Sequence, residues 1–386
     1  CEGSWVVCSP ESVGGFSATA YFFGRQVHNA LGVPVGLITS SVGGTPVEAW
    51  TSWEAQKDIA ELKPLFDSWA QRQAAWDPQK AQAIYQKRLA AWKTADKKGK
   101  RPPRRPVEPR LDPHHPAVLF NGKIAPLIPY AIRGAIWYQG ENNANGPRPH
   151  LYGMQLATLI KDWRNRWGQG EFPFGWVQLP NFRAPQKEPV EDSGWTLVRE
   201  GMLRTLALPN TGMAVTIDIG EADDIHPKNK QEVGRRLAMW ALADVYKRRG
   251  TVPCGPLPLG HKILDGELTI TFKYAEDGLV VKIGSGFVTP RDEWPNVWPP
   301  GGTGFGQVLG FAIAGEDRRW HRADARILGN TVVVRSEKVK QPVAVRYAWA
   351  NNPDCNLYNR AGLPASPFRT DDWPVEIVRE TAGVGR

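Results

Sequence analysis

The order of apolar segments over the first 250 residues constrains the fold most strongly. Helix-spaced apolar residues alternate with short, continuous apolar runs at 33–39, 133–138, 174–179 and 212–218. Each run has the length of a buried strand. Helices that alternate with buried strands are typical of a parallel sheet covered by helices. We therefore predict an α/β domain over residues 1–255.

The pattern changes after Gly250. Short runs rich in β-branched residues then follow one another, separated by Gly, Asp and Asn turns, and no helical period competes with them. These runs are 268–272, 279–283, 331–334 and 344–349. Closely spaced short strands indicate an all-β region. We predict a smaller, β-rich accessory region over residues 256–386.

A basic helical segment at residues 52–115 interrupts the predicted α/β domain. It is helical in pattern from Glu54 to about Ala95, and a Pro- and Arg-rich stretch closes it. It supplies most of the net charge of +9. Basic runs can bind nucleic acid, but prolines interrupt this one and no nucleic-acid module surrounds it. We interpret it as a solvated surface insertion and expect no nucleic-acid partner.

The amino-acid composition bears on which partners and ligands the protein could have. No apolar run approaches the roughly 18 residues that a membrane-spanning helix needs, so we expect no membrane partner. The four Cys are far apart and lack metal-ligand spacing. Their even number permits disulfides in an exported protein without requiring them. The 17 Trp are many for this length, and because exposed indoles stack on sugar rings, carbohydrate is an early candidate ligand.

Polar or glycine-rich turns follow three of the predicted strands, at 40–45, 138–143 and 219–226. The carboxyl ends of parallel strands meet along one edge of a sheet, where open α/β proteins bind their ligands. We therefore expect the three turns to lie together. The residues in them with useful chemistry are Gly43, Gly44, Gln139, Glu141, Asn142, Asp223 and His226.

These groups supply most of an acyl-transfer site. The backbone N–H groups of a Gly-Gly turn and the Gln139 amide can stabilise an oxyanion. Asp223 and His226 stand close enough in the sequence for one turn to carry a carboxylate–imidazole pair, which removes a proton from a nucleophile. Each element alone is also common in ordinary solvated loops. Their coincidence at strand ends favours the functional interpretation.

Several ordered motifs resemble the sialate O-acetylesterase family, whose members are SGNH-type carbohydrate esterases. The motifs are Gly43-Gly44-Thr45-Pro46 with Glu48-Ala49-Trp50, Trp137-Tyr138-Gln139-Gly140-Glu141-Asn142-Asn143-Ala144, and Asp224-Ile225-His226-Pro227 with Asn229-Lys230. The similarity covers nearly the whole chain apart from the basic insertion. It implies an SGNH-hydrolase-like three-layer α/β/α domain that hydrolyses acetyl esters on sugars. It also implies an acetylated carbohydrate as the substrate, no metal and no organic cofactor.

The resemblance also implies roles for individual residues. His226 would be the general base, and Asp223 or Asp224 would orient it. The choice between the two carboxylates stays open at this point. Gly43 or Gly44 and Gln139 would stabilise the oxyanion. The residues expected to line the substrate pocket are Trp137, Glu141 and Asn142, of which the last two could instead support Gln139.

The expected nucleophile is missing from this sequence. In the family it is a Ser in a Gly-Gln-Ser-Asn type motif upstream of the region that begins here, and residues 1–386 contain no such motif. Ser40 and Ser41 stand at a strand end, but in the family that turn belongs to the oxyanion hole. We therefore expect an N-terminally truncated chain, inactive or poorly active by itself. From the substrate class we expect an extracellular or periplasmic location.

Two alternatives remain. The first is a non-catalytic carbohydrate-binding protein that uses its Trp-rich surfaces. The second is a metal-dependent hydrolase. Its ligands would be Asp218, Glu221, Asp223, Asp224 and His226. A set with one His is poor for zinc and better suited to a hard cation.

Overall fold

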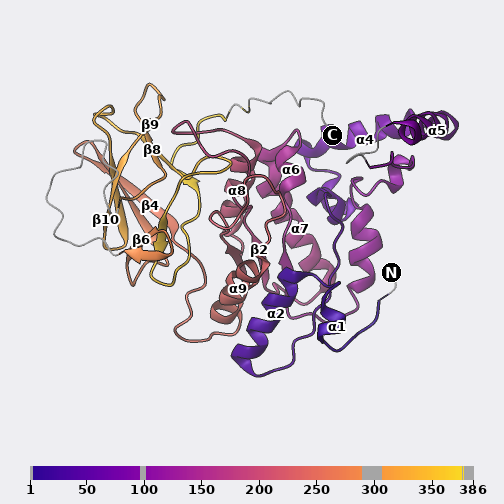
Figure 1. Cartoon of the computed structure of the whole chain (residues 1–386), viewed down its shortest axis with the longest axis horizontal. Helices are drawn as coiled ribbons and strands as arrows, with labels where there is room; N and C mark the ends of the chain where they lie inside the picture. The colour runs from indigo at the N-terminus through magenta and orange to yellow at the C-terminus, as the bar shows by residue number, and fades with distance from the viewer. Residues whose placement is uncertain (1–2, 96–100, 289–306, 376, 378–386) are drawn as a thin grey trace.

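The computed structural model describes residues 3–95, 101–288, 307–375 and 377. An α/β unit precedes an all-β unit, and the two lie side by side (Figure 1). The longer helices are α2 (Ala18–Leu31), α4 (Lys63–Ala74), α5 (Pro78–Thr94), α7 (Tyr152–Trp167), α8 (Gly194–Thr205) and α9 (Lys230–Trp240). The short helices are α1 (Pro10–Val13), α3 (Trp53–Gln56) and α6 (Glu141–Asn145). Within the described residues, no helix is both long enough and apolar enough to cross a membrane.

A parallel sheet forms the centre of the α/β unit. Within the described residues its strands are, in spatial order, β1 (Ala135–Trp137), β2 (Phe174–Val177) and β3 (Thr211–Ala214). Helix α9 covers one face of the sheet, with α2 packed on it, and α7 and α8 cover the other face (Figure 1). The predicted three-layer α/β/α fold is confirmed.

Glycines on the sheet let α9 pack closely. A Cβ atom at Gly212 would lie 2.0 Å from the Trp240 ring, and one at Gly175 would lie 2.3 Å from it. The Trp240 ring therefore fills the space that a side chain at position 175 or 212 would need, so only glycine fits at these two positions. Large side chains such as Trp176 and Met213 fill the opposite face, in the core shared with α7 and α8.

The run 33–39 is not a strand, contrary to the prediction. The segment forms no ladder with any described residue. Val33 is 45% exposed and Ile38 43% exposed, so its apolar composition does not reflect burial. Only part of the run packs inward, where Leu37 lies against Gly24 of α2. An apolar run becomes a strand only where a neighbouring strand pairs with it, and none of the described residues does so here.

The ends of the helices follow ordinary capping chemistry. The Ser17 hydroxyl caps α2 by accepting from the Ala20 N–H. Gly168 ends α7 in the left-handed conformation, with φ of 64°. Asn229 is the N-cap of α9, and Pro227 lies in the preceding loop.

The basic insertion is helical, as predicted. Its helices α3, α4 and α5 follow one another from Trp53 to Thr94. Helix α5 has no buried residue and extends away from the body of the protein (Figure 1). The insertion returns to the α/β unit through residues 109–117.

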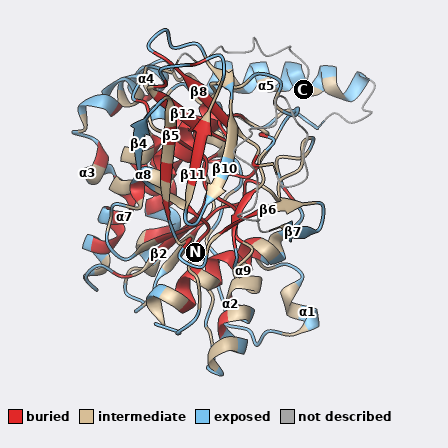
Figure 2. Cartoon of the chain, turned by 90° about the vertical axis from the view of Figure 1, so that its left-hand side faces the viewer, coloured by how far each residue is buried: buried red, intermediate tan, exposed pale blue. Residues whose placement is uncertain are grey.

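The all-β unit begins at Leu257. Its first sheet contains β10 (Asp324–Leu328), β11 (Thr331–Arg335), β5 (Glu267–Lys273) and β4 (Leu257–Leu264). Its second contains β14 (Phe368–Arg369), β12 (Ala344–Tyr347), β8 (Phe311–Ala314) and β9 (His321–Arg322). A smaller sheet contains β13 (Leu357–Asn359), β6 (Leu279–Ile283) and β7 (Gly286–Val288). Apolar residues of all three sheets share one core, and Figure 2 shows β8, β11 and β12 among the most buried strands.

Buried polar contacts join the two units. Arg199 of α8 is fully buried. Its guanidinium donates to four backbone carbonyls, those of Leu179, Pro180, Ala350 and Asn351. Because two of these carbonyls belong to each unit, Arg199 fixes the end of β2 against the all-β unit. Side-chain pairs that also cross the boundary are Arg369–Glu200, Arg346–Asp192 and Gln178–Ser366.

Candidate functional site

Two of the predicted polar turns, 40–45 and 138–143, lie in contact. The Asn142 side-chain amide donates to the Gly44 carbonyl at 2.7 Å. The Gln139 side-chain amide donates to the Thr45 carbonyl at 3.1 Å. Gly43 and Gly44 are exposed, and Gly44 has φ of 73°, a left-handed conformation that favours glycine. These two turns thus lie in contact, although the described residues 33–39 before the first turn form no strand.

A buried network below the contact holds the two turns together. The Asn143 side-chain oxygen accepts from the Val47 N–H at 3.0 Å, and its amide donates to Glu48 Oε2 at 3.0 Å. The Gln155 amide donates to the same carboxylate oxygen. Burial raises the pKa of the Glu48 carboxyl, although these donors and Arg148 oppose the shift. Glu48 and Asn143 both lie within the motifs that carry the family resemblance, but their role in joining the turns is not evident from the sequence.

The Gln139 side chain is fully engaged within the protein. Its amide donates to the Asn143 side-chain oxygen at 2.8 Å as well as to Thr45. Its oxygen lies 2.9 Å from the Tyr152 hydroxyl, which donates to it. Both amide hydrogens therefore already have acceptors. In this geometry Gln139 holds the turn in place. Asn142 is half-buried and uses its amide on one acceptor, so it is the more available donor.

Trp137, expected to line a substrate pocket, is buried in the core. Its ring packs edge-on against Trp50 and Trp163, each 5.9 Å away between ring centroids. Its indole N–H donates to the Tyr152 hydroxyl. The alternation of side chains along β1 directs this ring into the layer of α7.

The third turn holds His226 in an exposed position. The His226 side chain is 85% exposed. Its Nδ1 lies 3.7 Å from the nearer carboxylate oxygen of Asp224, which also accepts the His226 backbone N–H at 2.9 Å. Within the described residues, Asp223 makes no hydrogen bond or ion pair with His226. Asp224 is thus the carboxylate that contacts His226.

Glu141 connects the second turn to the third. It begins α6 directly after β1. Burial raises the pKa of its carboxyl, and the charges of Lys230 and His226 lie near enough to oppose the shift. The Lys230 ammonium in turn lies 4.9 Å from the centre of the Tyr138 ring. The second turn therefore contacts the first and lies close to the third.

The acidic residues of the third turn are largely paired. Both Asp218 carboxylate oxygens accept from Arg236, and one also accepts from the Tyr358 hydroxyl. Glu221 accepts from the backbone and side chain of Lys228. Among the described residues, no three His, Cys, Asp or Glu side chains gather in a way that could hold a metal ion. The paired Asp218 and Glu221 speak against the metal-dependent alternative.

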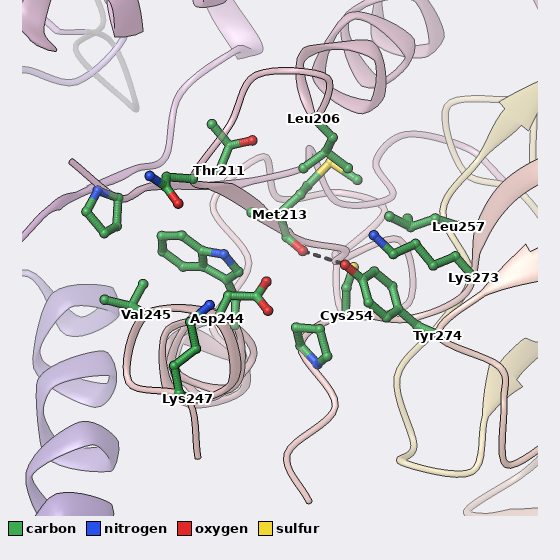
Figure 3. A pocket seen from close by; sticks show the side chains of 15 residues that line it. Leu206, Thr211, Met213, Asp244, Val245, Lys247, Cys254, Leu257, Lys273 and Tyr274 are labelled. Atoms are coloured by element: carbon green, nitrogen blue, oxygen red, sulfur yellow. Dashed lines mark hydrogen bonds between the residues drawn. The ribbon is translucent and has the colours of Figure 1, made fainter. Parts of the chain in front are cut away.

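A separate cavity of about 310 Å³ lies at the other end of the sheet. Its lining includes Thr211 and Met213 of β3, Asp244 and, from the all-β unit, Tyr274 (Figure 3). The Cys254 thiol donates to the Met213 carbonyl, shown as a dashed line in Figure 3. Since β3 begins at Thr211 and the polar turns follow the strand ends, this cavity is distinct from the candidate site.

Comparison with known proteins assigns the chain to a family. Residues 121–243 match the family described as carbohydrate esterase, sialic acid-specific acetylesterase. Sialate O-acetylesterase of Rattus norvegicus is 32% identical, over 91% of this chain and 63% of that protein. The Homo sapiens sialate O-acetylesterase is 29% identical, over 91% and 60% respectively. The chain thus spans about three fifths of the length of these curated relatives.

A solved structure is similar over nearly all of this chain. The crystal structure of a carbohydrate acetylesterase from Xanthomonas citri shares 35% sequence identity and superposes with a TM-score of 0.72, covering 97% of this chain and 69% of that one. The similarity extends through both the α/β unit and the all-β unit. The family match, the curated relatives and the solved structure all agree with the motifs at the strand ends. The chain belongs to the sialate O-acetylesterase family of carbohydrate esterases.

Proposed function

We propose that the protein is a carbohydrate O-acetylesterase that hydrolyses acetyl esters on sugars or glycans by a Ser-His-Asp type of acyl transfer. The observation that carries the proposal is the position of the second turn, which contacts the first turn through Asn142 and Gly44 and lies close to the third through Glu141 and His226. One turn presents the exposed N–H groups of Gly43 and Gly44, and the second presents the Asn142 amide. The third presents His226 beside Asp224. The relatives, named as a sialate O-acetylesterase and a carbohydrate acetylesterase, point to the same chemistry.

Each group has a role in the proposed reaction. His226 takes the proton of a serine hydroxyl as that oxygen attacks the acetyl carbonyl. The N–H groups of Gly43 and Gly44, together with the Asn142 amide, stabilise the oxyanion. His226 then gives the proton to the departing sugar oxygen, and water releases acetate in a second, equivalent step. Asp224 orients the imidazole and stabilises its charged form, a role for which Asp223 has no comparable contact.

No serine of this chain is assigned as the nucleophile. Ser40 donates its hydroxyl hydrogen to the Lys123 carbonyl, and Ser41 belongs to the turn proposed to stabilise the oxyanion. Glu141 supports the site from below through its charge interactions with Lys230 and His226. Neither step calls for a metal ion or an organic cofactor.

We further propose the organisation around this site. Residues 1–255 would form the esterase domain, with 52–115 as its insertion, and residues 256–386 the accessory region. An acetylated carbohydrate is the proposed substrate. Because acetylated glycans are found mainly outside the cytoplasm, we propose an extracellular or periplasmic location.

Acetate release from the full-length gene product tests the proposal. O-acetylated sialic acids and O-acetylated neutral sugars would be assayed in parallel, and a fluorophosphonate adduct would be mapped by mass spectrometry. We expect acetate release from at least one acetylated sugar and an adduct whose formation requires His226. Release that survives His226→Ala, or an adduct that forms equally well in that variant, would contradict it.

A second candidate is a carbohydrate-binding protein without catalysis. The observation that favours it is the 3.7 Å separation between His226 and Asp224, which exceeds a hydrogen bond. Calorimetric binding of an acetylated glycan to the full-length product, without any acetate release, would support this candidate over the esterase.

A further inference from the structure

A second Asp–His pair contacts the candidate site, and it comes from the end of the basic insertion. We propose that Asp112 and His114 are positioning residues that hold the oxyanion turn in place through the carbonyl of Gly44. The inference rests on the proposed function, because it assigns these two residues a part in the same reaction. It gives the insertion a task that its sequence did not indicate.

The contacts form a continuous chain. His114 Nδ1 lies 2.9 Å from Asp112 Oδ1, and the same oxygen accepts the His114 backbone N–H at 2.9 Å. His114 Nε2 lies 3.0 Å from the Gly44 carbonyl oxygen. The imidazole therefore bridges a carboxylate on the insertion and the Gly-Gly turn. Its geometry with Asp112 is closer than that of His226 with Asp224.

The acceptors define which atoms of His114 carry hydrogen. A backbone carbonyl has no proton to give, so Nε2 must donate to Gly44. Burial pushes the pKa of the Asp112 carboxyl upward, but hydrogen bonds from His114 outweigh it and leave the pKa lowered. The two ring nitrogens of His114 thus each face an oxygen, Nε2 that of the Gly44 carbonyl and Nδ1 that of the Asp112 carboxyl.

The Gly-Gly turn is open to solvent at its two glycines. A Cβ atom placed at Gly43 or at Gly44 would meet nothing within 4 Å, so no side chain packs against that side of the turn. The Gly44 carbonyl instead accepts from two sides, from Asn142 at 2.7 Å and from His114 at 3.0 Å. Two donors on one carbonyl fix the plane of the following peptide and the direction of the turn. Preorganised N–H groups are the part of such a site that acts on the transition state.

The rest of the insertion holds the pair in position. His115 stacks on Trp53 with their planes 7° apart and meets the edge of Trp69 at 5.0 Å between ring centroids. Arg72 of α4 lies 3.7 Å from the second oxygen of Asp112. The helices α3 and α4 thus supply a rigid base from which Asp112 and His114 reach the turn.

Steady-state kinetics of the full-length product tests the proposal. We expect His114→Ala to lower kcat about 10- to 100-fold, because a loosened donor stabilises the transition state less. KM should change less than about threefold, since the pair touches no substrate. His114→Gln, whose amide can still donate to Gly44, should recover part of the loss. The matched control is His261→Gln, on the exposed strand β4, which should leave both constants unchanged.

Amide hydrogen exchange provides a readout that does not depend on esterase activity. Peptides covering residues 40–45 should exchange faster in His114→Ala and in Asp112→Asn than in the wild type or in His261→Gln. The free energy of unfolding should stay close to the wild-type value in all three. Unchanged exchange at the turn would overturn the proposal even if the protein proves not to be an esterase. An unchanged kcat in an active His114→Ala enzyme would also overturn it.

Discussion

The side-chain amide of Asn142 donates to the backbone carbonyl of Gly44 across 2.7 Å, although the two residues are 98 positions apart in the sequence. This bond joins the turn that follows residues 33–39 to the turn that follows β1. It leaves the exposed Gly43 and Gly44 N–H groups beside an amide with a second hydrogen to donate. The proposed oxyanion site is built on this contact.

Asn142→Ala should therefore impair catalysis more than substrate binding. The substitution removes both an oxyanion donor and one of the two hydrogen bonds to Gly44. We expect kcat of the full-length product to fall about 100-fold or more, by analogy with the loss of one oxyanion-hole donor. Asn121→Ala, an exposed asparagine outside the site, is the control. A loss confined to KM would show that Asn142 only binds substrate.

Substitutions of the two neighbouring aspartates should separate their roles. Asp224 accepts the His226 backbone N–H and lies 3.7 Å from the imidazole, so Asp224→Asn should lower kcat strongly. Asp223→Asn should have little effect, because Asp223 does not contact His226 within the described residues. Both assays use acetate release at pH 7. Equal losses, or a larger loss in Asp223→Asn, would reverse the assignment.

Glu48→Gln should change how stability depends on pH. Burial raises the pKa of Glu48 above its usual value of 4.5, so the folded state favours the protonated carboxyl. That contribution to stability is complete below the usual pKa and is lost as the pH rises through the raised value. Glutamine never ionises. We expect Glu48→Gln to be more stable than the wild type at pH 8 and the difference to shrink towards pH 4.5.

Urea unfolding at both pH values measures this difference. Glu337→Gln, in the all-β unit, is a control for the loss of one negative charge. A stability difference for Glu48→Gln that is constant with pH would mean that the Glu48 carboxyl has the same pKa in the folded and unfolded states.

Arg199→Ala should destabilise the protein by several kcal/mol, because each buried carbonyl left without its donor costs about 1–3 kcal/mol. The substitution leaves four buried carbonyls without their donor. Arg204→Ala, one turn along α8 with an exposed side chain, should cost less than about 1 kcal/mol. Urea unfolding compares the two. Equal costs would show that Arg199 does not fix the all-β unit against β2.

The sequence predicts the layers of this fold well, because helical spacing and buried strands are local patterns. It fails for residues 33–39, where an apolar run resembles a strand but none of the described residues pairs with it. The composition of a segment shows that its side chains are apolar enough to be buried. It does not show whether another strand lies beside the segment to pair with it.

The candidate site is predictable only in part. Asn142 and His226 are indicated because they follow strands of one parallel sheet, whereas Gly44 follows a segment that forms no strand with the described residues. The acceptors of the Gln139 amide, Thr45 and Asn143, become apparent only in the folded chain. His114 is missed altogether, because its acceptor Gly44 lies 70 positions away across the insertion.

The proposed esterase site requires His226 to act as the general base beside the turns that carry Gly44 and Asn142. Acetate release by the full-length product and its His226→Ala variant, measured on the same O-acetylated sugar, tests it most directly. We predict a loss of at least about 1,000-fold in kcat/KM, in keeping with the removal of a catalytic histidine from a triad. A folded variant that retains a tenth or more of the wild-type value would contradict the claim.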